Sequence, residues 1–177
     1  MKWIGTAGGP FVMLPRGSTK LWGGYVTSYT AAYHLTEDGS TTVTDYDRAC
    51  EVSGSTGVLQ LGTSECLVFG NECCQAAWVN PVDRLQGYLV RWLYADGEDM
   101  ILEALSTLTD TSFDGTGIRF QNASNQLVLA DSATPGRKIS VENSLQIDLP
   151  VGDYIVNSIL HQPHARVGLL IHRFAPL

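Results

Sequence analysis

Short runs of aliphatic, aromatic and β-branched residues, separated by Gly- or Pro-containing segments, recur along most of this chain. Such runs are typical of strands that are bounded by turns. The plainest strand is predicted at residues 87–94, which are aromatic and aliphatic with a single charge. Residues 57–61 and 65–69 flank a Gly-containing turn and are expected to form a hairpin. This pattern favours folds in which antiparallel strands bury their apolar faces against one another.

Other segments follow the same pattern on both sides of this region. Strands are expected at residues 11–14, 76–79, 117–121, 126–130 and 144–149. Residues 154–160 and 167–174 are expected to form the arms of a terminal hairpin, which residues 161–164 link. Residues 41–52 are also expected to be extended, which would place the carboxylates of Asp45 and Asp47 on the same side of the chain.

One amphipathic helix is expected at about residues 97–108. Its apolar residues recur at the i, i+4, i+7 spacing of a helix face: Ile101, Leu105 and Leu108. Asp96 precedes the helix and can cap it, and acidic side chains in its first turn suit the positive end of the helix dipole. The outward face then carries three acids: Glu98, Asp99 and Glu103.

These elements predict a mainly β (α+β) fold, in which antiparallel strands form a sandwich or an open barrel and are joined by one helix. The length of 177 residues suits one domain with its own core. No repeat at a fixed period and no Ser/Pro-rich linker divides the chain. We therefore expect residues 1–177 to form a single domain.

The charge of the chain is concentrated in its middle. The formal net charge is −7. Residues 1–36 hold three basic residues and no acid, residues 37–114 hold fourteen acids and three bases, and residues 115–177 hold four acids and five bases. The middle region would repel nucleic acid and anionic membranes and attract a basic protein. We therefore expect a protein partner, although such charges also serve solubility alone.

The expected compartment is the cytoplasm. No apolar stretch is long enough to span a bilayer, and no export signal is seen after Met1. The thiols are therefore expected to be reduced and to behave as small hydrophobic side chains: Cys50, Cys66, Cys73 and Cys74. No CxxC pair or histidine motif of a zinc site occurs, so neither a metal nor another cofactor is expected.

Patterns that carry catalysis are weak in this chain. The Gly-rich residues 5–10 lack the lysine and serine of a phosphate-binding loop, and no GxSxG serine motif occurs. Two alternatives stay open. Asp45 and Asp47 with the C-terminal histidines would suit a small hydrolase or metal-dependent enzyme, and a β-barrel with an interior cavity would suit a small ligand. Because an exposed acidic ridge needs no catalytic explanation, we expect no catalytic residues.

Several segments resemble, in order along the chain, the immunity protein 21 family. They are WIGTAGGP at 3–10, the apolar run ending at Pro15, LWGG at 21–24, DYDRAC at 45–50, LVRWLYAD at 89–96 and LPVGDY at 149–154. The resemblance implies a bacterial immunity protein of a polymorphic or contact-dependent toxin system, which binds and neutralises a cognate toxin. No catalytic residues come with the family.

The partner is therefore expected to be a cognate protein toxin, bound by a protein that is monomeric when free. A basic, nuclease-like toxin is one class that an acidic inhibitor would suit. Trp22 is added to the candidate contacts because its Gly-rich loop would expose it as an interface anchor. The expected contact residues are Asp45, Asp47, Glu72, Glu98, Asp99, Glu103 and Trp22.

Overall fold

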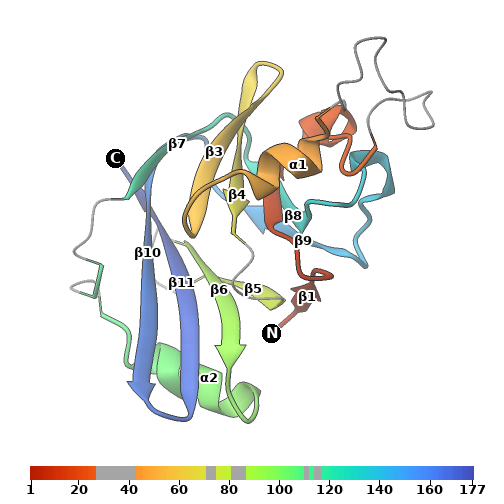
Figure 1. Cartoon of the computed structure of the whole chain (residues 1–177). Helices are drawn as coiled ribbons and strands as arrows, with labels where there is room; N and C mark the ends of the chain where they lie inside the picture. Colours follow the sequence, from red (N-terminus) through yellow and green to blue (C-terminus); the bar gives the residue numbers. More distant parts are fainter. Residues whose placement is uncertain (27–42, 71–74, 81–86, 110–111, 114–116) are drawn as a thin grey trace.

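The structure is a computed structural model that describes residues 1–26, 43–70, 75–80, 87–109, 112–113 and 117–177 (Figure 1). Within these residues the strands form two antiparallel sheets. The six-stranded sheet has the order β1 (Trp3–Gly5), β5 (Gln75–Val79), β6 (Gly87–Tyr94), β11 (Val167–Pro176), β10 (Gly152–His164) and β7 (Ile118–Asn122). The five-stranded sheet has the order β3 (Thr56–Leu61), β4 (Ser64–Phe69), β2 (Phe11–Pro15), β8 (Gln126–Asp131) and β9 (Ser144–Asp148).

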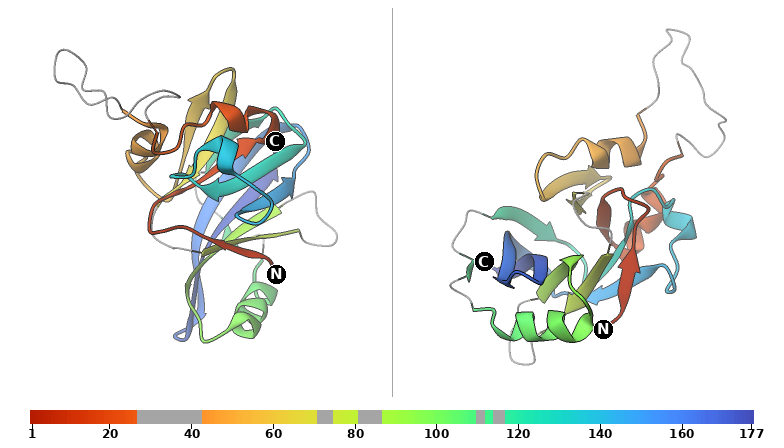
Figure 2. Two further views of the ribbon diagram at one scale, coloured as in Figure 1. Left: turned by 90° about the vertical axis from the view of Figure 1, so that its right-hand side faces the viewer. Right: turned by 60° about the horizontal axis from the view of Figure 1, so that its bottom comes forward.

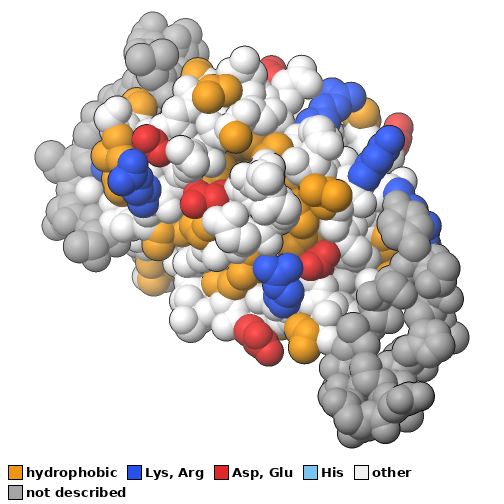
Figure 3. Space-filling model, turned by 90° about the horizontal axis from the view of Figure 1, so that it is seen from above, with side chains coloured by type: hydrophobic (Ala, Val, Ile, Leu, Met, Phe, Trp, Pro, Cys, Tyr) orange, Lys and Arg blue, Asp and Glu red, His pale blue; other side chains and the backbone are white. Residues whose placement is uncertain are grey.

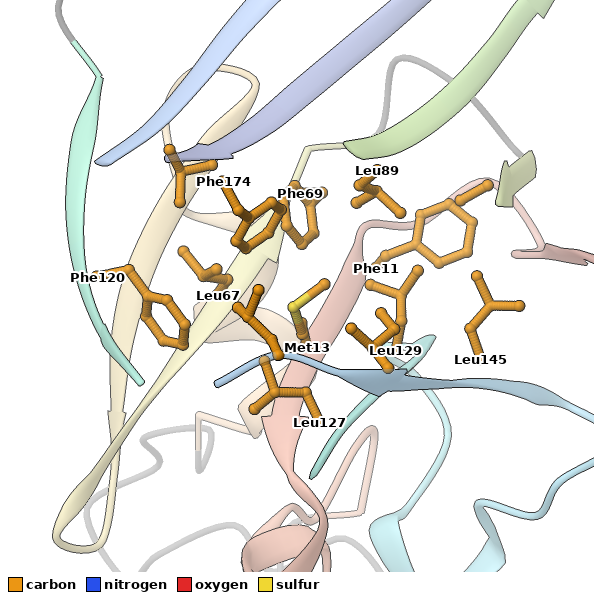
Figure 4. Packing of buried hydrophobic residues seen from close by; sticks show 14 of the residues in the cluster. Phe11, Met13, Leu67, Phe69, Leu89, Phe120, Leu127, Leu129, Leu145 and Phe174 are labelled. Carbon is orange, nitrogen blue, oxygen red and sulfur yellow. The ribbon is translucent and has the colours of Figure 1, made fainter. Parts of the chain in front are cut away.

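The two sheets pack face to face around one apolar core. Every strand except β3 contributes a buried side chain, because alternate residues of each strand point to the same side. Phe11, Met13 and Phe69 from the five-stranded sheet meet Leu89 and Phe174 from the six-stranded sheet (Figure 4). These side chains fill the region that an interior ligand cavity would need, which weighs against the small-ligand alternative.

The outer face of each sheet is also covered. The helix α2 (Glu98–Ser106) packs its buried Ile101 and Ala104 on β6 and β11 of the six-stranded sheet. The helix α1 (Asp45–Cys50) and the 3-10 helix η1 (Arg16–Leu21) cover the five-stranded sheet, where Trp22 and Ala49 join the buried cluster. A second 3-10 helix, η3 (Gly136–Lys138), follows β8. The helices α1 and α2 lie at opposite ends of the molecule in all three views (Figures 1 and 2).

The mainly β class and most predicted strands are confirmed. The strand β6 occupies the predicted residues, and β3 and β4 form the predicted hairpin around Gly62, whose positive φ of 63° suits the tight turn. The terminal hairpin β10–β11 is also present. The predicted link at residues 161–164 is wrong, because these residues continue β10 through a register shift and the turn lies at Ala165 and Arg166.

Two further predictions about local structure are wrong. The part of residues 41–52 that the structure describes is not extended, because Thr44 caps a short helix, α1. Asp96 does not cap α2: the N-cap residue is Gly97, and the Asp96 carboxylate forms an ion pair with Arg166 instead.

Candidate functional site

The two candidate acids of α1 are held by contacts within the protein. Asp47 and Thr44 form a capping box, in which the Asp47 N–H donates to Thr44 Oγ1 at 3.0 Å and the Thr44 N–H donates to Asp47 Oδ2 at 2.9 Å. These hydrogen bonds from Thr44 hold the pKa of Asp47 below its usual value. Asp45 Oδ2 accepts from the Gly23 N–H at 2.7 Å, and Asp45 Oδ1 accepts from Arg48 at 2.9 Å. Both carboxylates therefore stabilise the start of α1.

Trp22 is buried, so the expected exposure of this side chain is wrong. Only 2% of its surface is accessible, and its indole N–H donates to the Ser132 carbonyl at 2.9 Å. A buried indole requires such a partner, and this one comes from the loop after β8. Trp22 and Asp45 do lie near each other, because both line a cleft that also contains Lys20 and Arg137. Glu72, another predicted contact, lies outside the described residues.

The helix α2 places the remaining candidate acids on the surface. Asp99 and Glu103 are exposed and four residues apart, so they lie on the same side of the helix. Neither carboxylate has a hydrogen-bond or ion-pair partner among the residues that the structure describes. Leu102 lies beside them and is 50% exposed. Together, Asp99, Leu102 and Glu103 are called here the α2 surface.

Contacts at both ends of α2 hold this surface in place. Glu98 forms an ion pair with the amino terminus of Met1, which explains why Glu98 is only half-exposed. At the other end, the His161 side chain lies 2.9 Å from the Ala104 carbonyl and 3.1 Å from Thr107 Oγ1. The buried face of the helix supplies the remaining packing. The unpaired carboxylates therefore stand on a rigid element, which is what a preorganised binding surface needs.

The candidate acids do not form one continuous acidic surface. The acids of α1 lie over the five-stranded sheet, whereas those of α2 lie over the six-stranded sheet at the other end of the molecule. On the face that is uppermost in Figure 1, acidic and basic side chains are interspersed (Figure 3). The helical spacing predicted the exposure of the α2 acids. The spacing of Asp45 and Asp47 in the sequence did not predict that their carboxylates bind groups within the protein.

The grouping that the enzymatic alternative requires is not formed. Asp45 and Asp47 lie on α1, whereas His161 contacts α2 and His172 is buried between the sheets. In the part of the chain that the structure describes, no three His, Cys, Asp or Glu side chains are placed to hold a metal ion.

A buried polar group that the sequence did not reveal lies between the sheets. His172 Nδ1 is 2.7 Å from Ser158 Oγ and 2.9 Å from Thr56 Oγ1. Burial of the ring, with the nearby Arg91 guanidinium, holds the pKa of His172 well below its usual value. A serine and a histidine at this distance suit nucleophilic catalysis, but this imidazole is fully buried and its Nδ1 also contacts the Thr56 hydroxyl. The group therefore joins β3, β10 and β11.

Comparisons with known proteins give one result. The family model described as Immunity protein 21 matches residues 2–166 of the chain. No curated protein and no solved structure matches. None of the described helices is long and apolar enough to cross a membrane.

Proposed function

Because the chain belongs to the immunity protein 21 family, we propose that it binds a cognate protein toxin through the α2 surface and neutralises it without catalysis. On this proposal residues 1–177 act as one unit, monomeric before the toxin binds, in the cytoplasm of a bacterium that carries a polymorphic toxin system. No cofactor takes part. The observation that carries the choice of surface is a pair of carboxylates, Asp99 and Glu103, that have no partner among the described residues and lie beside a half-exposed leucine.

The chemistry of this surface favours a basic partner. Exposed charges that lack an internal partner steer an oppositely charged protein during encounter and accelerate association. Leu102 adds exposed apolar area beside these charges, which a partner can cover on binding. A toxin that acts on nucleic acid has a basic surface for its substrate, so a nuclease is one class that fits.

The other acids near α2 are less suited to this role. Asp96 is paired with Arg166, and Glu98 is paired with the amino terminus. A partner that engaged these carboxylates would first have to displace their present partners. Asp99 and Glu103 carry no such cost, so they form the core of the proposed contact.

The test is a double charge reversal, Asp99→Lys with Glu103→Lys. We expect its association rate with the toxin at low salt to fall roughly tenfold, and the dependence of that rate on salt to weaken, because the steering charge has changed sign. The matched control is Asp148→Lys with Glu142→Lys, which makes the same change of charge at exposed acids beside the five-stranded sheet.

The control should lose much less of the association rate, and a cooperative urea-unfolding transition in both variants shows that they are folded. A third variant, Leu102→Ala, should mainly raise the dissociation rate, since it removes apolar contact without changing charge. If the double reversal on α2 associates at the rate of the parent at low salt, α2 does not contact the toxin.

A further inference from the structure

A second cleft, between the β7–β8 loop, the β9–β10 turn and the start of η1, differs in chemistry from the α2 surface. It is open to solvent and has a volume of about 570 Å³. The described residues that line it include Arg16 of η1, Asn125 and Gln126 at the start of β8, and Val151 of the β9–β10 turn. A cleft of this size is large enough to hold a side chain of a partner together with its neighbours.

This cleft is far from the α2 surface. Val151 directly precedes β10, which begins at Gly152. The same strand reaches α2 only at His161, whose side chain lies 2.9 Å from the Ala104 carbonyl. From Gly152 to His161 an extended strand advances by about 30 Å. The cleft and the α2 surface are therefore separate regions of the molecule.

Hydrogen bonds from side chains hold the two turns of the cleft against each other. The buried Asn122 side chain donates from Nδ2 to the carbonyls of Leu149, at 3.0 Å, and Pro150, at 2.8 Å. The Val151 N–H donates to Asn125 Oδ1 at 3.1 Å, and the Leu149 N–H donates to the Asn125 carbonyl at 3.2 Å. These walls are preorganised, which lowers the entropy cost of binding.

Arg16 is the one charged side chain among the described residues that line the cleft. It is exposed, and its guanidinium has no hydrogen-bond or ion-pair partner in the part of the chain that the structure describes. Asp148 stands opposite Gln126 in the β8–β9 ladder, but it lies outside the lining and forms no ion pair with Arg16. A guanidinium donates two parallel N–H groups to a carboxylate, so Arg16 suits a ligand with this group.

The neutral side chains beside Arg16 suit the same ligand. Because Asn125 Oδ1 accepts from the Val151 N–H, its Nδ2 group is left to donate, and no described residue accepts from it. The Gln126 side chain is exposed and likewise has no partner among the described residues. Val151 is 58% exposed and adds apolar area next to these donors. An apolar contact beside a charged one favours a protein segment over a simple anion.

We propose that this cleft is a docking site for an acidic segment of a protein partner. In the docked segment, the carboxylate of a Glu or Asp side chain pairs with the Arg16 guanidinium and accepts from the Asn125 side-chain amide. An aliphatic side chain next to it packs on Val151. This site is separate from the α2 surface and takes a partner segment of the opposite charge.

The test uses the peptide acetyl-Gly-Val-Glu-Val-Gly-amide as probe and ¹⁵N-NMR of the full chain, with the Val151 backbone N–H and the Asn125 side-chain amide as reporters. We expect saturable shifts of both signals as the peptide is raised to about 10 mM, a range that detects even weak complexes. The same peptide with Gln in place of Glu should bind about tenfold more weakly, because it lacks the charge that the guanidinium recognises. Acetyl-Gly-Gly-Glu-Gly-Gly-amide should also bind more weakly, because it lacks the side chains that pack on Val151.

The variant Arg16→Gln should lower the affinity for the Glu-Val peptide about tenfold, because it removes the guanidinium. Its matched control is Lys20→Gln, which removes one positive charge from an exposed residue of the same element, η1, outside the lining of this cleft. This control should bind the peptide nearly as well as the parent. Native dispersion of the amide signals in both variants shows that they are folded.

The proposal is wrong if the Glu-Val peptide produces no saturable shift, or if Arg16→Gln and Lys20→Gln bind it equally well. It is also wrong if the Gln peptide or the Gly peptide binds as tightly, because the cleft would then not recognise an acidic protein segment. Each of these outcomes leaves the α2 interface standing, because that interface is tested by toxin association with variants at the other end of β10.

Discussion

Acidification should destabilise this protein through one buried side chain, His172. The ring is fully buried between the two sheets, with its centroid 4.8 Å from that of Phe69. Its Nδ1 contacts two hydroxyl groups, and burial together with Arg91 holds its pKa well below the usual value. The folded protein therefore keeps this imidazole neutral at pH values where an exposed histidine is protonated.

The size of the change in the free energy of unfolding follows from the difference in bound protons between the unfolded and the folded protein. Below the pKa of about 6.5 of an unfolded histidine, the unfolded chain takes up a proton that the folded protein does not. The free energy of unfolding then falls by about 1.4 kcal/mol per pH unit, which approaches about 2 kcal/mol by pH 5. The stabilisation is complete above this pKa and is lost as the pH falls. Hydrogen bonds lower the pKa of Asp47 and Glu142 in the folded protein. Protonation of these carboxylates therefore lowers the free energy of unfolding only in more acidic solution.

Urea unfolding, followed by tryptophan fluorescence between about pH 7.5 and pH 5, measures this dependence. The parent should lose about 2 kcal/mol over this range. His172→Gln should start from lower stability but lose that much less on acidification, because the titrating group is gone. His164→Gln, which removes an exposed histidine, should follow the parent. An unchanged pH dependence in His172→Gln would refute the reasoning.

Two further predictions concern local structure. Thr44→Ala removes the capping box of α1 and should lower the free energy of unfolding by about 1 kcal/mol in the same urea titration. The control Thr63→Ala, in the exposed turn between β3 and β4, should change the free energy of unfolding by less than about 0.5 kcal/mol. Equal losses in the two variants would contradict the role of the cap. Burial raises the pKa of the Cys66 thiol to about 12, so iodoacetamide near neutral pH should modify exposed Cys50 and leave Cys66 unmodified until the protein unfolds. Peptide mass mapping measures both sites, and similar rates at the two cysteines would show that Cys66 is accessible.

The parts of the fold that sequence predicted are those whose signal is local. Alternation and turn residues indicated β6, the β3–β4 hairpin and the β10–β11 hairpin, because apolar residues recur at every second position of a half-buried strand. The spacing of apolar residues indicated α2 and, with it, the exposure of Asp99 and Glu103. The two acids of the α2 surface could therefore be predicted from the sequence.

The parts that sequence missed depend on distant contacts. The helix α1 is too short to show a periodic apolar face, and it is stabilised by the Thr44 cap and by burial of Ala49. Trp22 lies in a Gly-rich segment that suggested an exposed loop, but its indole N–H is bonded to a residue 110 positions away. The buried His172 group likewise joins the β10–β11 hairpin to Thr56 of β3, which is 116 positions from His172 and which no local pattern relates to that hairpin.

The central claim is that this protein neutralises a toxin by forming a complex with it. Titrating the purified protein into a fixed amount of the cognate toxin domain, while toxin activity is measured and the mixture is passed over a size-exclusion column, tests it most directly. We predict that activity falls in proportion to the complex formed, and that Asp99→Lys with Glu103→Lys requires a higher concentration than the parent. Full toxin activity in a saturating excess of the parent protein, with no complex on the column, would contradict the claim.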